Sequence, residues 1–197
     1  NGGSAVGEED FNVRMAQMGA LVIRYRAYFV RRLQEAAPAV HRDFSGGREE
    51  LSLTYQTVSS VSDPTAAPQK ILEQLRDHQE RHRQAELDSR QCLSGPHKDD
   101  LLVELDGRSA KIYGSQGQTR TAALSLKLAQ RDIFFQETGE YPVLLLDDVL
   151  SELDTRRQAF VLNHIQGGQI FITCCEEEKL EGLEGGAAFH INGGALV

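Results

Sequence analysis

The first part of the chain has the apolar spacing of one long helix. Apolar side chains recur every three or four residues from Asp10 to about Ala37, as at Met15, Val22 and Phe29. This period places them on one face of an amphipathic helix. Pro38 is expected just beyond the helix end, because proline interrupts the hydrogen bonding of a helix interior.

The segments that follow change period. Residues 51–58, LSLTYQTV, alternate apolar and polar positions, which predicts a strand with one wet face. Residues 62–69 are rich in proline and small residues and indicate a linker. Residues 70–90 have a helical pattern with few apolar positions. We expect this helix on the outside of the molecule, or as one side of a projecting arm.

A hairpin and a helix come next. Residues 101–114 predict two strands around a turn at Asp106-Gly107, a pair of residues typical of tight hairpins. The helix that starts after this hairpin is expected to end near Gly139.

Two apolar runs then predict neighbouring strands. Residues 141–148, YPVLLLDD, are typical of a strand buried on both faces, and residues 167–175, GGQIFITCC, predict a second buried strand. A helix is expected between them over residues 155–165. Strand, helix and strand in this order predict parallel pairing in an α/β fold. Residues 187–197 are expected to form a last hairpin.

Composition and charge narrow the class of protein. With 197 residues, 40% of them hydrophobic, the chain can bury a core. Its apolar runs are too short to cross a bilayer and no signal segment opens it, so we expect a soluble, cytoplasmic protein. The net charge of −8 argues against a protein that binds polyanions over its whole surface.

The charge is nevertheless uneven along the chain. Arginine outnumbers acidic residues in the first 42 positions, whereas acids dominate from residue 136 onward. A basic face on the N-terminal part is compatible with nucleic-acid binding, and a solvated helix face explains the same charges equally well. The candidates for contacts with DNA or a partner are Arg14, Arg24, Arg26, Arg31 and Arg32.

Cysteine and histidine spacing gives no strong signal for a metal. Cys92, Cys174 and Cys175 are an odd number without zinc spacing, so we expect three reduced thiols. His78 and His82 are four residues apart on one helix face, a spacing that can bind a metal. On so polar a helix we expect both histidines to be solvated instead.

Two carboxylates follow the first apolar strand. Asp147 and Asp148 come at its C-terminal end, where open α/β sheets bind their ligands. Neighbouring strand residues point to opposite sides, so one carboxylate can hold Mg²⁺ while the other reaches a water. This is the Walker B arrangement of P-loop NTPases. A pair of acids where a strand leaves the core is the simpler alternative.

The stretch from Tyr113 to Gln130, YGSQGQTRTAALSLKLAQ, opens a helix without acidic charge. The small and polar residues at its mouth let a ligand approach the backbone. A helix N-terminus offers free N–H groups and a partial positive charge, so it suits a phosphate, which a carboxylate there would repel. An ordinary helix cap is the alternative.

The order of these pieces is more specific than any one of them. A Ser-x-Gly-Gln turn opens a helix, a strand ends in Asp-Asp, Ser151-Glu152-Leu153-Asp154 follows, and a second strand comes last. Signature motif, Walker B motif, D-loop and switch strand have this order in ABC-type ATPases. The stretches GSQGQTRTAALSLKLAQ, GEYPVLLLDDVLSELDTRRQ and GPHKDDL closely resemble the RecF family, in the SMC-like branch of ABC ATPases. The resemblance runs from about Met15 to the end of the chain.

This resemblance implies a fold and a function. The fold would be a helical arm lobe, residues 10–98, and the C-terminal half of an ABC-type ATPase lobe with a mostly parallel sheet, residues 99–197. Proteins of this family sandwich ATP between two protomers, and the ATP-bound homodimer clamps double-stranded, gapped or single-stranded DNA. They act with RecR in recombination, replication and repair at gaps and support the SOS response.

The resemblance also implies roles for single residues. Asp147 would hold Mg²⁺, and Asp148 would lie where the attacking water is activated. The γ-phosphate of ATP bound to the partner protomer would meet the mouth of the helix, and the D-loop would lie at the dimer interface. The residues beside the nucleotide would be Ser115, Gln116, Gly117, Gln118 and Asp154.

Two features depart from the family pattern. The P-loop pattern G-x-x-x-x-G-K-[ST] does not occur in the chain. The chain therefore resembles a C-terminal fragment, which we expect to bind ATP weakly and to be inactive alone, with weak ATPase activity only in the full-length protein. Cys174 stands where many ABC ATPases have a switch histidine, and a thiol cannot take that role.

Two other classes of function stay open. One is a nucleotide-independent interaction module that binds a partner through its arm. The other is an ATPase subunit of a transporter. The charged arm and the Asp-Asp pair speak against the transporter, because transporter ATPases usually have Asp-Glu at this position.

Overall fold

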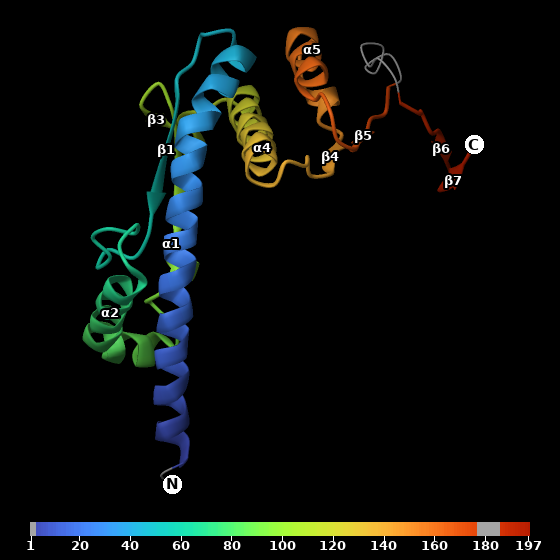
Figure 1. Cartoon of the computed structure of the whole chain (residues 1–197). Helices are drawn as coiled ribbons and strands as arrows, with labels where there is room; N and C mark the ends of the chain where they lie inside the picture. The colour runs from blue at the N-terminus through green and yellow to red at the C-terminus, as the bar shows by residue number, and fades with distance from the viewer. Residues whose placement is uncertain (1–2, 177–185) are drawn as a thin grey trace.

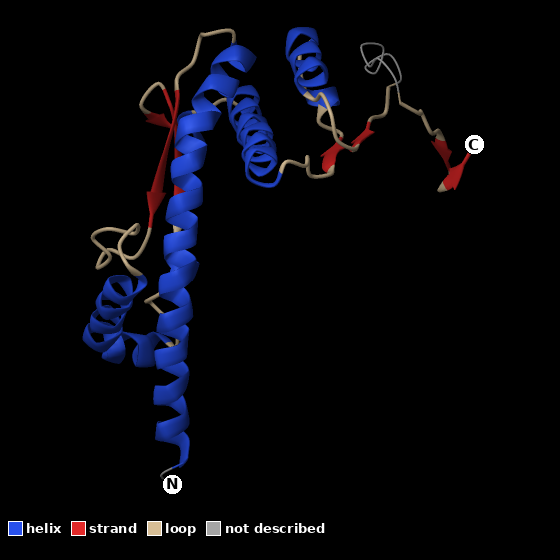
Figure 2. Cartoon of the chain, in the orientation of Figure 1, coloured by secondary structure: helices blue, strands red, loops and turns tan. Residues whose placement is uncertain are grey.

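One long helix runs along the first part of the molecule, and the C-terminal strands extend away from it to one side (Figure 1). The structure, a computed structural model, describes residues 3–176 and 186–197. Figure 2 shows that helices make up most of it, with short strands between them. The elements are α1 (Gly3–Ser45), β1 (Leu51–Gln56), α2 (Pro68–Ser89), η1 (Pro96–Lys98), β2 (Asp100–Leu105), β3 (Arg108–Ser109), α3 (Ala110–Tyr113), α4 (Gln116–Thr138), β4 (Leu144–Asp147), η2 (Leu150–Glu152), α5 (Thr155–His164), β5 (Ile170–Thr173), β6 (Ile191–Asn192) and β7 (Ala195–Leu196).

Helix α1 is longer at both ends than the sequence predicts. It runs from Gly3 to Ser45 with Pro38 inside it, so the predicted end before Pro38 is wrong. The last turns bury apolar side chains such as Phe44 in the core, and this packing outweighs the hydrogen bond that proline removes. The helix stops before Gly46, whose φ of +70° is a backbone conformation that glycine adopts at low cost.

The first half of α1 packs against α2 and forms an arm (Figure 1). Helix α2 is polar on its outer face, as predicted. The buried apolar residues of the arm are Ala16, Ala20, Ile23, Val58, Val61, Ile71 and Leu75.

The histidine pair of α2 does not lie in solvent. His78 is buried, and its Nδ1 is 2.6 Å from the hydroxyl of Ser94. His82 is half-buried and stacks on His78 with ring centroids 4.0 Å apart. The prediction of two solvated histidines is therefore wrong, because the turn before η1 folds over α2. Burial lowers the pKa of His78, since apolar surroundings disfavour the imidazolium ion.

The second half of α1 packs into a larger core. Strand β1 pairs antiparallel with β2, with Leu51 opposite Leu105, and β2 pairs with β3. The predicted hairpin at Asp106-Gly107 is confirmed, although its second strand is short because α3 takes its last residues. One buried cluster joins α1, this sheet, α4, β4 and α5. The sheet thus pairs strands from both sides of residue 98, the predicted boundary between the arm lobe and the ATPase lobe. That boundary stays a prediction.

Asp99 connects the arm helix to the sheet. Its side chain is only 3% exposed, and its carboxylate accepts hydrogen bonds from Tyr55 Oη (2.5 Å), Thr57 Oγ1 (2.7 Å) and Arg26 Nη1 (2.8 Å). Three donors offset the desolvation of the buried charge. Burial raises the pKa of Tyr55, and the neighbouring Asp99 raises it further.

Strands β4 and β5 pair in parallel, as predicted, with Leu144 opposite Ile170 and Asp147 opposite Thr173. Their burial is one-sided in the described residues: Leu145 of β4 is 70% exposed and Phe171 of β5 is 52% exposed. The prediction that the first of these strands is buried on both faces is wrong, because only alternate side chains of β4 reach the core shared with α4 and α5. The prediction of a second buried strand is wrong as well, because the side chains of β5 alternate between half-buried and exposed.

The chain ends as predicted, in the hairpin β6–β7. Among the described residues, no helix combines the length and apolar character that a membrane span needs.

Candidate functional site

The mouth of α4 is built by its own first residues. Ser115 is the N-cap, and its hydroxyl accepts a hydrogen bond from the backbone N of Gln118 at 3.3 Å. In return the backbone N of Ser115 donates to Gln118 Oε1 at 2.9 Å. This is a capping box, which satisfies two free N–H groups of the helix end. Gln116 is exposed.

A glycine is required directly before this cap. A Cβ on Gly114 would lie 2.4 Å from the backbone O of Ala110, so a larger residue would push α3 and α4 apart. The tight approach fixes the start of α4 against the short helix α3. The alternative prediction for this stretch, an ordinary helix cap, is therefore confirmed. A capping box satisfies only some of the free N–H groups of a helix end, so the first turn can still bind a ligand.

Gln118 also contacts a carboxylate that the sequence pattern does not reveal. Its Nε2 donates to Glu49 Oε1 at 3.1 Å, and Glu49 Oε2 lies 3.3 Å from His41 Nε2. His41 is fully buried, and burial lowers its pKa, against the opposing effect of Glu49. The expectation of a helix mouth without carboxylates is wrong in three dimensions, because Glu49 reaches it from the turn after α1.

Helix α5 brings two charged side chains to the same place. Asp154 is the N-cap of α5 and accepts from the backbone N of Arg157 at 2.9 Å. The Arg157 guanidinium lies 3.2 Å from the Asp154 carboxylate and 3.7 Å from the position that a Cβ on Gly117 would take. The predicted signature and D-loop residues are therefore neighbours. Sequence reasoning missed Arg157, because no spacing rule relates it to Gly117.

Asp147 and Asp148 lie at the exposed C-terminal end of β4, where Thr173 of β5 holds them. Asp147 Oδ1 accepts from the Thr173 hydroxyl at 2.6 Å, and the backbone N of Asp148 donates to the same hydroxyl at 3.0 Å. Asp148 has φ +50°, a left-handed conformation that aspartate adopts more readily than most residues. Its carboxylate accepts from the Ser151 hydroxyl. The neighbouring strand thus fixes the Asp147 carboxylate and the backbone of Asp148, and Ser151 holds the Asp148 carboxylate.

The Asp147 carboxylate offers the kind of oxygen ligand that Mg²⁺ prefers. In nucleotide sites one or two carboxylates hold Mg²⁺ together with phosphate oxygens and water. Within the described parts of the chain, no three His, Cys, Asp or Glu side chains gather to hold a metal by themselves. A pocket of ≈ 330 Å³ adjoins Asp147 and Asp148, and Arg120 and Lys127 of α4 also line it.

Known proteins resemble this chain in sequence and in fold. No family model matches the chain. It is 43% identical over 187 residues to the DNA replication and repair protein RecF of Bacillus subtilis (strain 168), a match that covers 93% of this chain and 50% of the relative. A solved structure described as the recombination mediator protein RecF-ATPrS in the RecFOR pathway matches 100% of this chain and 51% of its own, at 33% identity and a TM-score of 0.83. The family that the chain matches is RecF.

Further RecF proteins agree. RecF of Alkaliphilus oremlandii (strain OhILAs) is 37% identical over 201 residues, which covers 100% of this chain and 54% of the relative. A structure described as RecF-ATP in the RecFOR pathway has a TM-score of 0.79 at 33% identity, over 96% of this chain and 49% of its own. The chain thus spans about half the length of the RecF relatives that it matches. The RecF resemblance and the α/β fold class are confirmed.

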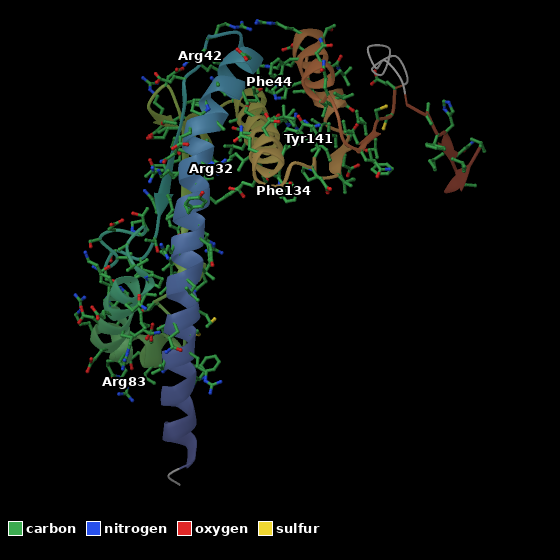
Figure 3. The ribbon with its side chains drawn as sticks, in the orientation of Figure 1. Arg32, Arg42, Phe44, Arg83, Phe134 and Tyr141 are labelled. Atoms are coloured by element: carbon green, nitrogen blue, oxygen red, sulfur yellow. The ribbon has the colours of Figure 1, made fainter. Side chains whose placement is uncertain are left out.

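In this RecF-like chain the five predicted arginines differ in their contacts. Arg26 pairs with Asp99, and Arg32, labelled in Figure 3, places Nη1 2.8 Å from Glu137 Oε1 at the end of α4. These two side chains join elements of the chain to one another. The remaining candidates, all exposed on α1, are Arg14, Arg24 and Arg31. Contacts with DNA or a partner stay a prediction for all five.

The three cysteines are free thiols. Cys174 directly follows β5 and is half-buried, and its Sγ donates to the backbone O of Glu176 at 3.4 Å. It thus stands beside Thr173, which holds Asp147 and Asp148.

Proposed function

We propose that the chain supplies the signature motif, the Walker B carboxylates and the D-loop of a RecF-type, ATP-gated DNA clamp that acts in DNA replication and repair. Two protomers sandwich ATP, and Ser115 and Gly117 of one protomer face the γ-phosphate held by the other. The ATP-bound homodimer then binds DNA and works with RecR in recombination at gaps and in the SOS response. Weak ATPase activity limits the lifetime of the clamp.

The observation that supports this most is the meeting of two helix N-termini. Gly117 in the first turn of α4 lies next to Arg157 in the first turn of α5. Both helix ends carry a partial positive charge, and the Arg157 guanidinium, paired with Asp154, lies beside them. Ser115 and Gln116 are exposed and uncharged there. Such a surface favours the phosphate of a nucleotide bound to another protomer.

The carboxylates at the end of β4 serve the nucleotide of their own protomer. Asp147 holds Mg²⁺, which neutralises phosphate charge when it is bound. Asp148 accepts a hydrogen bond from the attacking water and orients it. The hydroxyl of Thr173 keeps Asp147 in place from β5, and Ser151 does the same for Asp148. Catalysis of phosphoryl transfer needs little more than such positioning.

A nucleotide-independent interaction module is the second candidate function. It is favoured by the large apolar side chains that α1 exposes in the described structure, among them Phe11, Met18, Tyr25 and Tyr28. Exposed aromatic and methionine side chains are typical of surfaces that bind other proteins. In this case partner binding would not depend on ATP.

ATP-dependent dimerisation tests the proposal. The test protein contains this sequence and has the full length of the RecF relatives; it is called the full-length form below. Its mass is measured by sedimentation with and without ATP. We expect Ser115→Arg to abolish the ATP-dependent dimer, because the long cation occupies the phosphate position. Ser89→Arg, on the exposed end of α2, is the matched control and should dimerise normally. An ATP-dependent dimer in Ser115→Arg contradicts the proposal, and a dimer indifferent to ATP favours the interaction module.

A further inference from the structure

The C-terminal end of α1 contacts the predicted signature helix and the predicted D-loop helix at the same time. Phe44 lies between α4 and α5 (Figure 3) and stacks on Phe160 of α5 with ring centroids 4.8 Å apart. The guanidinium of Arg156 lies over Gly46, within 2.5 Å of the place that a Cβ there would take. The arm helix is thus fixed to α5 just beyond the D-loop residue Asp154.

The contact with α4 runs through polar groups. The Gln118 amide has both ends engaged: its oxygen accepts from the backbone N of Ser115, and its nitrogen donates to Glu49. Glu49 in turn lies against His41, one turn before the end of α1. The His41 Nδ1 is 3.1 Å from the hydroxyl of Ser125 inside α4. Two hydrogen bonds, joined by the 3.3 Å contact between His41 Nε2 and Glu49 Oε2, therefore lead from the buried part of α4, past α1, to the α4 cap.

We infer that Glu49 is a positioning residue for the signature motif, through which the arm helix α1 sets the geometry of the phosphate-facing mouth of α4. The inference rests on the proposed function, because it assigns Glu49 to the site at which the partner's nucleotide binds. Glu49 itself does not touch the nucleotide. It acts on Gln118, and Gln118 acts on the backbone of Ser115.

Glu49 matters for the cap because, without a partner, the side chain of Gln118 would adopt several rotamers. Gln118 has three rotatable bonds, and ordering it costs conformational entropy. A hydrogen bond to the Glu49 carboxylate is stronger than one between neutral groups and holds a single rotamer. In that rotamer the amide oxygen reaches the Ser115 N–H. Small misplacements of a phosphate-binding backbone have large effects, because its donors act only over hydrogen-bond distance.

The same contacts link the arm to the site. A displacement of α1 moves His41 in its last turns and, through the turn that follows the helix, Glu49 as well. The side chain of Gln118 then has to follow or release Ser115.

The test uses Glu49→Ala and Glu49→Gln in the full-length form, with Glu50→Ala as the matched control on the next, exposed residue. Glutamine keeps an oxygen for Gln118, whereas alanine removes the partner altogether. Three properties are measured: the protein concentration at which ATP drives half of the protein into dimers, the ATP affinity of the isolated protomer, and the midpoint of thermal unfolding.

We expect Glu49→Ala to raise the dimerisation midpoint on the order of tenfold, the change in an equilibrium constant that follows from one lost charge-assisted hydrogen bond. Glu49→Gln should restore most of this loss. The ATP affinity of the protomer should stay unchanged, because Glu49 lies away from the carboxylates at the end of β4. A purely structural role would instead lower the unfolding midpoint, the ATP affinity and the dimerisation together.

Two results would overturn the inference. One is a dimerisation midpoint of Glu49→Ala equal to that of Glu50→Ala, and the other is a parallel loss of all three properties. Ser115→Arg, measured beside them, separates the two proposals. If Ser115→Arg abolishes dimerisation while Glu49→Ala has no effect, only the positioning role is wrong. If Ser115→Arg has no effect either, the proposed function is wrong, and the role of Glu49 with it.

Discussion

Replacement of Asp99 by asparagine tests how the arm is held to the rest of the molecule. The carboxylate accepts three hydrogen bonds, from Tyr55, Thr57 and Arg26. A bond to a charged acceptor exceeds a neutral one by about 1 kcal/mol, so three would give about 3 kcal/mol. Arg26 is 49% exposed, and its share is reduced by solvent screening. We therefore expect Asp99→Asn to lower the free energy of unfolding by about 2 kcal/mol.

Urea and thermal unfolding, followed by circular dichroism, measure this change. A loss of about 2 kcal/mol lowers the unfolding midpoint of a chain of this length by about 6 °C. Asp100→Asn is the matched control, because Asp100 is the exposed neighbour and its carboxylate accepts from the backbone N of the next residue. If Asp99→Asn and Asp100→Asn unfold at the same midpoint, the buried carboxylate does not hold the arm and this reasoning is refuted.

Three further predictions follow from the site and from buried titratable groups. In the full-length form, Asp148→Asn should lower ATP turnover by about a hundredfold, because a misplaced attacking water costs a factor of this size, and spare ATP-dependent dimerisation; turnover at the normal rate would remove Asp148 from its role. Burial lowers the pKa of His41 and of His78, so the unfolded chain takes up protons first and stability should fall as the pH drops below 6.5, the ordinary value. Urea unfolding at several pH values checks this, and the slope should flatten in His41→Gln/His78→Gln; an unchanged slope would speak against it. The raised pKa of Tyr55 means that stability should fall as the pH rises above the ordinary value of 10.0; Tyr55→Phe should remove this dependence, and if it persists in that variant another group is responsible.

The periodic elements could be predicted because their signals are local. Helices α2, α4 and α5 and the parallel pair β4 and β5 follow from apolar spacing and from the order of the elements. The failures come from tertiary packing. Pro38 continues a helix because Phe44 and its neighbours are buried beyond it, and His78 is buried because a distant turn covers α2. The spacing of apolar residues predicts neither the continuation of the helix through Pro38 nor the burial of His78.

The candidate site divides in the same way. Ser115, Asp147 and Asp154 stand at element ends that a motif can reveal, and the structure places them at two helix caps and a strand end. Glu49 and Arg157 have no motif. They reach the mouth of α4 from the ends of other helices, and only the packing of α1, α4 and α5 brings them there. The contacts of Glu49 and Arg157 could therefore not be predicted from the sequence alone.

DNA binding by the full-length form, measured with and without ATP beside Ser115→Arg, tests the central claim most directly. We expect ATP to tighten DNA binding, and Ser115→Arg to abolish this gain while leaving the ATP-independent binding in place. DNA binding that responds neither to ATP nor to the substitution would contradict the ATP-gated clamp.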